Sequence, residues 1–431
     1  MNLLVTNTQE DQAYLIIRSL REHVDNIFVA VEEGGFFKRW SGMSLWSRFV
    51  KRRHRVPACG TDWRAGRLQK ENTEAEEAYI QAIEEICRRE SIDCIFPSYD
   101  SDVYVLSKNR ERLADQGVVA VCPDYGQLCR FLDKAETLEA ARKVGFPIPR
   151  TRMITEIDDL AEAAREIAPP WVLKPRCDAH AANIGLARHK DELISVFRQL
   201  QNVQDRPLLQ EFVPPETKRN FYVVVGRDNE VVSVLSPKVH RTRKTGLQTP
   251  CAAVESSREI PLENELRALL RELGAWGGFT VQTIVDARDG KQKLMEINPR
   301  FGHNLWYQTE LDINAPLMLL RIARGEDPGS VLPIRDGVIL LDPLWDSLHL
   351  VGQALDQSAA WIRRVFGGTT DEAEPYEKES IRQLLRQLRS EYFGNRPRVT
   401  SPLNRGYFSD PLPPLAHFLS VLGKTIKRRL R

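Results

Sequence analysis

The stretch Val281–Gly302, VQTIVDARDGKQKLMEINPRFG, has two runs of strand-forming residues separated by the turn sequence DARDGK. Such a pattern indicates a β-hairpin. Side chains alternate between the two faces of a strand, so every second residue lies on the same face. Glu296, Asn298 and Arg300 are therefore expected to point the same way, as an acid, an amide and a cation in one row.

The residues around this row predict where the second strand packs and where it stops. By the same alternation Leu294 belongs to the face of the polar row, while Met295 and Ile297 are expected to face a core. Pro299 has no amide hydrogen and cannot donate to a strand ladder, so the strand is expected to end there.

The hairpin brings a further oxygen ligand to the polar row. Gln282 lies on the first strand, and the turn folds it against Glu296 on the second. Carboxylate and amide oxygens are hard ligands that suit Mg²⁺, and an arginine beside them suits a phosphate. The alternative is a solvated strand edge with an incidental ion pair.

Composition restricts the class of protein. The chain has 431 residues, enough for two or three domains, and its 61 basic and 59 acidic residues leave a formal charge of +2, which does not indicate a nucleic-acid partner. The seven cysteines form no CxxC pair, so neither a zinc site nor a disulfide framework is expected. The N-terminus lacks the pattern of a signal peptide and no apolar run is long enough to span a membrane, so a cytoplasmic protein is expected.

Residues 1–124 are expected to form a doubly wound α/β domain, because short buried strands such as NLLVTN and NIFVAVEE alternate with amphipathic helices. The basic and aromatic stretch between Phe36 and Arg55 is expected to interrupt this order, either as a solvated loop or as a phosphate-binding surface. After a boundary near residue 125 the pattern changes to hairpins and predicts an α+β domain up to residue 330.

Two lysines upstream are candidate phosphate contacts. Lys134 begins a helix in DKAETLEAARK, and Lys174 ends a strand in PPWVLKPR. A cation at either position offsets phosphate charge, although a lone lysine is more often a surface charge.

Taken together, these motifs resemble the ATP-grasp superfamily, and most closely the synthetase domains of the carbamoyl-phosphate synthetase large subunit. The resemblance covers roughly residues 1–326, and it implies an N-terminal pre-ATP-grasp domain followed by an ATP-grasp domain of two subdomains hinged near residues 210–214. It implies ATP and Mg²⁺ as cofactors, with Mn²⁺ as an alternative ion.

The resemblance also implies roles for residues that match the family motifs. Nucleotide contacts are implied at Lys134, Lys174, Gln210, Glu211, Val213 and Glu216, metal ligands at Gln282, Glu296 and Asn298, and catalytic contacts to the transferred phosphate at Arg300 and Lys174.

The sequence departs from the family in two places. The expected phosphate lid, RCDAHAANIG, keeps only Gly185 where relatives carry several glycines. The acid expected to contact the ribose is displaced, so Glu216 and Asn220 are both candidates.

Two further segments are candidates for substrate binding. The basic segment KVHRTRKTG is expected to be a loop that holds the acid or the triphosphate, or else a mobile solvated loop; it carries Lys238, His240, Arg241, Arg243 and Lys244. Beside the polar row, His303 and Trp306 are substrate contacts or core, with His303 the better candidate.

The last hundred residues, 331–431, fall outside the resemblance and are expected to be mostly helical. The helix predicted in residues 414–431 combines an apolar stripe with five cations among its last eight residues. It would pack on the protein's own core, lie on an anionic membrane surface or contact a partner protein.

The resulting functional hypothesis is an ATP-dependent ligase that activates a carboxylic acid as an acyl phosphate for attack by an amine or another nucleophile. Bicarbonate chemistry through carboxyphosphate is one alternative, and a nucleotide-binding scaffold acting through the basic tail is another. A homodimer is left open.

Overall fold

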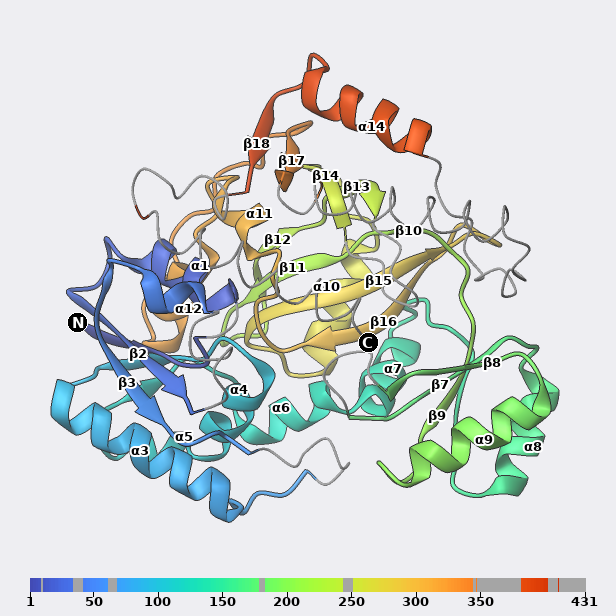
Figure 1. The fold of residues 1–431 in the computed structure, drawn as a ribbon, viewed down its shortest axis with the longest axis horizontal. Coiled ribbons are helices and arrows are strands. Elements are labelled where there is room, and N and C mark those ends of the chain that lie inside the picture. Colours follow the sequence, from blue (N-terminus) through green and yellow to red (C-terminus); the bar gives the residue numbers. More distant parts are fainter. Residues whose placement is uncertain are drawn as a thin grey trace, which may run out of the picture.

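The protein is described by a computed structural model (Figure 1). The structure describes residues 1–8, 11–33, 42–60, 68–177, 183–242, 251–343, 346, 381–401 and 410. Four sheets organise these residues, and Figure 1 shows the N-terminal sheet on one side of the molecule and the hairpin sheet at its centre.

The N-terminal domain is built on a five-stranded parallel sheet of order β3-β2-β1-β4-β5. Alternate residues of the central strand enter different cores: Leu3 packs with helix α1, whereas Leu4 packs with helices α3 and α4. Both faces of the sheet are therefore covered, and the predicted doubly wound arrangement is confirmed. The elements are β1 Asn2–Val5, α1 Asp11–Leu20, β2 Asn26–Glu32, a 3-10 turn Met43–Trp46, β3 Val50–Val56, α3 Glu74–Glu90, β4 Cys94–Phe96, α4 Asp100–Lys108, α5 Arg110–Ala114 and β5 Val119–Ala120.

The basic stretch before Arg55 is not the loop that the sequence predicted. Val50–Val56 forms edge strand β3, parallel to β2, with Arg52, Arg53 and Arg55 exposed. Alternation failed as a signal here because an edge strand can carry cations that point to solvent, and such charges protect the edge from pairing with other chains.

The first lobe of the following domain is a four-stranded antiparallel sheet, β6-β9-β7-β8. Helices α8 and α9 cover the face that carries Trp171, Leu173 and Leu209. The elements are β6 Thr151–Met153, α8 Ile157–Glu166, β7 Trp171–Lys174, β8 Gly185–Ala187, α9 Lys190–Gln201 and β9 Leu208–Glu211.

The second lobe is the hairpin sheet, β10-β15-β11-β12, with β16 paired to β15. Helices α7 and α10 cover the face that carries Val281 and Leu294. The elements are α6 Tyr125–Leu132, α7 Lys134–Lys143, β10 Pro215–Lys218, β11 Phe221–Val225, β12 Val231–Leu235, α10 Glu263–Glu272, β15 Gly277–Asp286, β16 Gln292–Asn298, α11 Leu305–Thr309 and α12 Ala315–Ala323.

Two segments cross between the lobes. Residues 144–150 lead from α7 to β6, and residues 212–214 lead from β9 to β10. They run side by side where Glu211 donates its amide to the Arg150 carbonyl, 2.9 Å away. The lobes are thus connected by a double hinge.

The predicted hairpin is confirmed, but its face assignment needs a correction. The register shifts between the pairs Gln282↔Glu296 and Thr283↔Leu294, so Met295 is a bulge residue. Leu294 is consequently fully buried in the core with Ile297, and does not share the face of Glu296. The strand ends at Asn298, immediately before Pro299 as predicted.

The C-terminal residues contribute strands as well as a helix. Strands β13 (Lys238–Thr242), β14 (Cys251–Glu255), β17 (Ile339–Leu341) and β18 (Arg398–Thr400) form a fourth sheet, above which helix α14 (Ile381–Phe393) lies in Figure 1. The prediction of a mostly helical extension missed β17 and β18, because both are three residues long. The basic helix predicted in residues 414–431 lies outside the described residues.

Candidate functional site

The predicted metal ligands gather at the end of the hairpin in the second lobe. Gln282 pairs directly with Glu296, and Thr280 with Asn298, so the three polar side chains project from adjacent positions of one face. Asn298 Nδ2 donates to Glu296 Oε1 at 3.2 Å. The bulge at Met295 makes this possible, since it allows Glu296 to face the site while Leu294 and Ile297 both stay in the core. Met295 itself is only partly buried and does not face the core as expected.

Two lysines converge on the same carboxylate from other elements. Lys134 stands at the first position of α7, and its Nζ lies 3.9 Å from Glu296 Oε2. Lys174 ends β7 in the first lobe, is 4% exposed, and donates from Nζ to the Met295 carbonyl at 3.3 Å. The hydrogen bond of Lys174 therefore crosses from one lobe to the other.

Burial, together with the nearby charge of Lys134, lowers the pKa of Lys174 to about 7, while Glu296 opposes the shift. A buried ammonium without a close carboxylate is unstable in its charged form. Since one carboxylate faces two lysines, this part of the site favours an additional anion.

The oxygen donors fit a magnesium ion that is shared with an anion. Among the described residues no group of three or more His, Cys, Asp or Glu side chains could hold a metal. The protein's share of a site at this position is one carboxylate, Glu296, and two amides, Gln282 and Asn298. Mg²⁺ commonly binds through one or two carboxylates and completes its shell with water and substrate phosphates.

The hinge residue Gln210 has an unsatisfied acceptor. Its side chain is buried, and Nε2 donates to Thr151 Oγ1 at 2.8 Å, but its Oε1 has no hydrogen-bond partner among the described residues. An unpaired buried acceptor costs roughly 1–3 kcal/mol. A ligand donor at this position would remove that cost.

The other predicted nucleotide contacts differ in their surroundings. Val213 is buried, and Glu211 directs its side chain into an ion cluster that is described below. Glu216 is exposed on β10, whereas Asn220 Oδ1 accepts from the Thr283 amide at 3.2 Å. Of the two ribose candidates, Asn220 is thus engaged within its own sheet.

Little of the expected phosphate lid is described, because residues 178–182 lie outside the described ranges. Gly185, its one glycine, begins β8 and packs against α9, where a Cβ would come within 2.1 Å of Val196 Cγ1. This glycine is explained by close packing of strand on helix and gives no support to a flexible lid.

Arg300 lies beyond the end of β16 and reaches the N-terminal domain. Its Nε and Nη2 donate to the two carboxylate oxygens of Asp100, each at 2.8 Å, and its guanidinium stacks over Tyr99. Asp100 is the first residue of α4 and is 4% exposed. The guanidinium that was expected to contact the transferred phosphate is therefore bound by a protein carboxylate, which the sequence reasoning did not identify.

The remaining substrate candidates, His303 and Trp306, have different surroundings. His303 Nδ1 lies 3.1 Å from Asp11 Oδ2, again across the boundary with the N-terminal domain. Trp306 is buried and its ring contacts Tyr307, so it belongs to the core.

The segment KVHRTRKTG is not a loop where it is described. Lys238, His240 and Arg241 belong to strand β13, and the first two pair with Glu259 and Glu255. Arg243 and Lys244 lie outside the described residues.

One further pair was not predicted and supports the site. Arg176 forms an ion pair with Asp133, the N-cap of α7, and its carbonyl accepts from the Lys134 amide at 3.0 Å. This contact joins the end of β7 to the start of α7 and so holds Lys174 near Lys134. The capping aspartate was a signal that sequence reasoning could have used.

Family comparisons agree with this arrangement. Residues 131–303 match the family model described as ATP-grasp domain. These residues form an ATP-grasp domain. Residues 73–121 match a second family model, the PylC-like N-terminal domain, which lies within the doubly wound part of the chain.

Sequence relatives of the ATP-grasp domain include large enzymes. The chain is 22% identical over 248 residues to the carbamoyl phosphate synthase large chain of Thermus thermophilus, an alignment that covers 54% of this chain and 24% of the relative. The corresponding chain of Methanobrevibacter smithii is 21% identical over 293 residues, with 62% and 27% covered. This chain thus matches about a quarter of the length of these relatives.

Solved structures share the fold. The biotin carboxylase domain of Hydrogenobacter thermophilus 2-oxoglutarate carboxylase, a dimer solved with MgADP and bicarbonate, superposes with a TM-score of 0.60 at 16% identity and covers 78% of this chain and 73% of its own. N5-carboxyaminoimidazole synthetase of Staphylococcus aureus gives 0.54 at 13% identity, with 77% and 78% covered. Identities this low establish a common fold.

The described part of the chain contains no helix that is long and apolar enough to cross a membrane. Six of the described cysteines are free: Cys59, Cys87, Cys94, Cys122, Cys129 and Cys177.

The Asp100–Arg300 pair predicts an energetic link between the N-terminal and ATP-grasp domains. We expect Asp100→Asn to lower the free energy of unfolding by about 3 kcal/mol, because it leaves a largely buried guanidinium without its counter-ion. Urea denaturation of the two single variants and of Asp100→Asn/Arg300→Gln would give the coupling energy. A coupling below about 0.5 kcal/mol would contradict the link. Exposed Asp115→Asn is the matched control.

Lys174 predicts an unusual pH dependence of stability. The folded-state pKa is lowered from 10.5 to about 7, so between these values the unfolded chain binds a proton that the folded chain does not, and stability rises with pH. We expect Lys174→Met to be more stable than the unmutated protein by roughly 2–4 kcal/mol near pH 7, because it removes this buried charge. The difference should shrink toward pH 10.

Thermal unfolding followed at several pH values would test the prediction for Lys174. Lys190→Met, at an exposed position of α9, should show no such pH-dependent difference. A Lys174→Met variant less stable than the unmutated protein at pH 7 would show that the lysine is stabilised as a cation.

Proposed function

We propose that the protein is an ATP-dependent ligase that uses Mg²⁺, activates a carboxylic acid as an acyl phosphate and passes the acyl group to an amine or another nucleophile. The γ-phosphorus forms a bond to a carboxylate oxygen as its bond to the β-phosphate oxygen breaks, which releases ADP. The nucleophile then forms a bond to the acyl carbon, the carbon–oxygen bond to phosphate breaks, and the nucleophile loses a proton.

The observation that carries this proposal is the unbalanced charge around Glu296. Lys174 is buried with its pKa held near 7, and Lys134 also lies close to the same carboxylate. A bound triphosphate would supply the missing negative charge and hold Lys174 as a cation. The unpaired Oε1 of Gln210 lies at the hinge, where it would accept a hydrogen bond from the adenine amino group.

The chain's own residues have separate tasks in this mechanism. Gln282, Glu296 and Asn298 would hold the metal, which when bound neutralises charge on the phosphates. Lys134 and Lys174 offset the charge that moves onto the leaving oxygen. Arg300, fixed by Asp100, is the proposed cation beside the transferred phosphoryl group. Val213, the Glu211 backbone and Glu216 would contact the nucleoside.

A second candidate is bicarbonate as the acid, with carboxyphosphate as the activated form. It is supported by the solved neighbour bound to bicarbonate and by relatives named carbamoyl phosphate synthase. A nucleotide-binding scaffold without catalytic turnover is disfavoured. Gln282, Glu296 and Asn298 share one face of the hairpin, and both lysines lie beside that face. A homodimer and a contact through residues 414–431 remain part of the proposal.

Glu296→Ala tests the metal assignment. Since Glu296 is the one carboxylate of the proposed ligand set, its loss should reduce Mg²⁺-dependent ADP formation by more than roughly a hundredfold while the protein stays folded. ADP release would be measured over a panel of acids and amines, with exposed Glu162→Ala as the control. Undiminished turnover in folded Glu296→Ala would refute the assignment.

Oxygen labelling tests the acyl phosphate. With the acid labelled by ¹⁸O in its carboxylate, one labelled oxygen should appear in the released phosphate, because the bridging oxygen leaves with phosphorus. If labelled bicarbonate alone transfers its oxygen without an organic acid, the second candidate is the correct one. ADP formation that depends on an organic acid but transfers no label would exclude this activation chemistry.

A further inference from the structure

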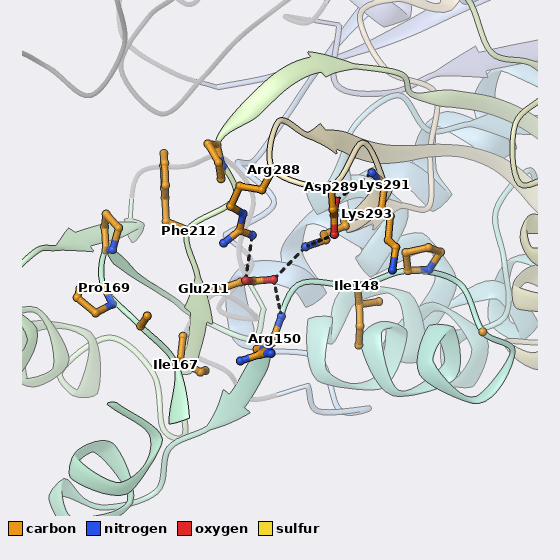
Figure 2. A pocket seen from close by; sticks show the side chains of 15 residues that line it. Ile148, Arg150, Ile167, Pro169, Glu211, Phe212, Arg288, Asp289, Lys291 and Lys293 are labelled. Atoms are coloured by element: carbon orange, nitrogen blue, oxygen red, sulfur yellow. Dashed lines mark hydrogen bonds and ion pairs between the residues drawn. The ribbon is translucent and has the colours of Figure 1, made fainter. Parts of the chain in front are cut away.

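A large pocket lies at the double hinge, away from the site around Glu296. Its volume is about 990 Å³, and its walls come from both crossing segments, from residues 167–170 before β7 and from the β15–β16 turn (Figure 2). Lys134, Lys174, Gln282, Glu296, Asn298 and Arg300 are not among the lining residues. The pocket is therefore separate from the proposed metal and phosphate site.

The pocket is also on the other face of the hinge from the expected nucleoside contacts. Glu211 lines it, while its strand neighbour Gln210 does not, and successive side chains of a strand point to opposite faces. Val213 and Glu216, which are also predicted nucleoside contacts, are likewise absent from the lining. The end of β9 thus directs Glu211 toward the pocket and Gln210 toward the opposite side, where the nucleoside is expected.

The charge of the pocket favours an anion. Its lining includes four cations, Arg150, Arg288, Lys291 and Lys293, and two acids, Glu211 and Asp289. Figure 2 shows Glu211 at the centre, where it accepts from the Arg150 amide at 3.0 Å, Arg288 Nη2 at 3.0 Å and Lys293 Nζ at 3.2 Å. Arg288 and Lys293 are thus already paired with protein carboxylates.

Two cations are left for a ligand. The side chains of Arg150 and Lys291 are exposed, and neither has an ion-pair partner among the described residues. Arg150 belongs to the crossing segment that enters the first lobe, and Lys291 to the turn of the second lobe. A ligand that reaches both cations would contact both lobes.

The remaining wall is apolar and rigid. It is formed by Pro147, Ile148, Ile167, Pro169, Phe212 and Pro214. Prolines fix the backbone on both sides of the pocket, so little conformational entropy is lost when a ring or chain packs there. The combination of an apolar wall and two cations suits an amphipathic anion.

We propose that this pocket binds a small organic anion, a phosphate or carboxylate carried on an aromatic or aliphatic body, through Arg150 and Lys291. Because the two cations belong to different lobes, the ligand would favour the lobe arrangement that brings them together. Any ligand of the inter-lobe cleft that prefers the same arrangement would then bind more tightly, and the effect would be reciprocal.

Calorimetry with phenyl phosphate and benzoate would test the proposal, because both probes join an anion to a flat apolar ring. The protein would first be saturated with Mg²⁺ and a non-hydrolysable ATP analogue. Binding of at least one probe should persist in the presence of the analogue, and benzylamine, a cation of similar shape, should not bind. Displacement of both probes by the analogue, or no binding of either at millimolar concentration, would refute the pocket assignment.

Charge-removing variants locate the site. Arg150→Gln/Lys291→Gln should weaken probe binding by roughly tenfold or more, since two charge-assisted contacts are lost. Both side chains are exposed, so the fold should survive, which thermal unfolding would verify. Lys190→Gln/Lys143→Gln, with both positions exposed and outside the pocket, should bind as the unmutated protein does. Equal affinity in the two double variants would refute the proposal.

A separate measurement tests the coupling between probe binding in the pocket and binding of the ATP analogue. Saturation with the bound probe should change the affinity of the ATP analogue at least severalfold, by the same factor as the analogue changes probe affinity. Unchanged affinities would refute the coupling. The binding test does not depend on ligase activity: if the analogue fails to bind, the proposed function fails while probe binding to the unliganded protein still tests the pocket.

Discussion

The energetic constraint at the centre of this structure is a buried positive charge that, among the described residues, is opposed by the carboxylate of Glu296. Lys174 sits at the end of a strand in one lobe, donates to the backbone of the other lobe, and shares one nearby carboxylate, Glu296, with Lys134. Burying a cation in this way costs free energy unless an anion accompanies it. The unfavourable position of Lys174 is maintained because the ion pair of Arg176 with Asp133 joins the end of β7 to the start of α7 and so holds the two lysines near each other. The proposed binding of an anionic ligand rests on this arrangement.

The N-terminal domain takes part in the site through ion pairs at its boundary. Asp100 receives two hydrogen bonds from Arg300, and Asp11 lies beside His303, so both helices α4 and α1 present an acid at their first residue. Carboxylates at a helix N-terminus are stabilised by the helix dipole. They can therefore hold a cation of the neighbouring domain in one orientation. The orientation of Arg300 is thus fixed in part by a residue of the N-terminal domain.

Sequence reasoning placed the polar residues of the hairpin better than the residues around them. Alternation along two strands was enough to place Gln282, Glu296 and Asn298 together, because hairpin pairing is local. The bulge at Met295 was not predicted. One inserted residue reverses the faces to which the neighbouring strand residues point, and the amino-acid composition does not reveal such an insertion. Leu294 was misplaced for this reason alone.

Contacts between distant segments were beyond the same reasoning. Asp100 and Arg300 are 200 residues apart, and a single acid at a helix start has many potential partners. Strands β17 and β18 are three residues long and gain their hydrogen bonds from a sheet that other segments build. Edge strand β3 carries the charges of a loop. In each case tertiary pairing, which has no local period, determines the structure.

The last two residues of β9 point to opposite sides of the hinge and have different surroundings. At the end of β9, Gln210 leaves a buried acceptor open on one face, whereas Glu211 is fully engaged by Arg150, Arg288 and Lys293 on the other. Burial would raise the pKa of Glu211, but these hydrogen bonds lower it below its ordinary value, so the carboxylate stays ionised. The ionised side chain ties the hinge to the turn of the second lobe. A movement of the lobes that opens the hinge on the side of Gln210 must therefore also displace the charged side chains on the side of Glu211.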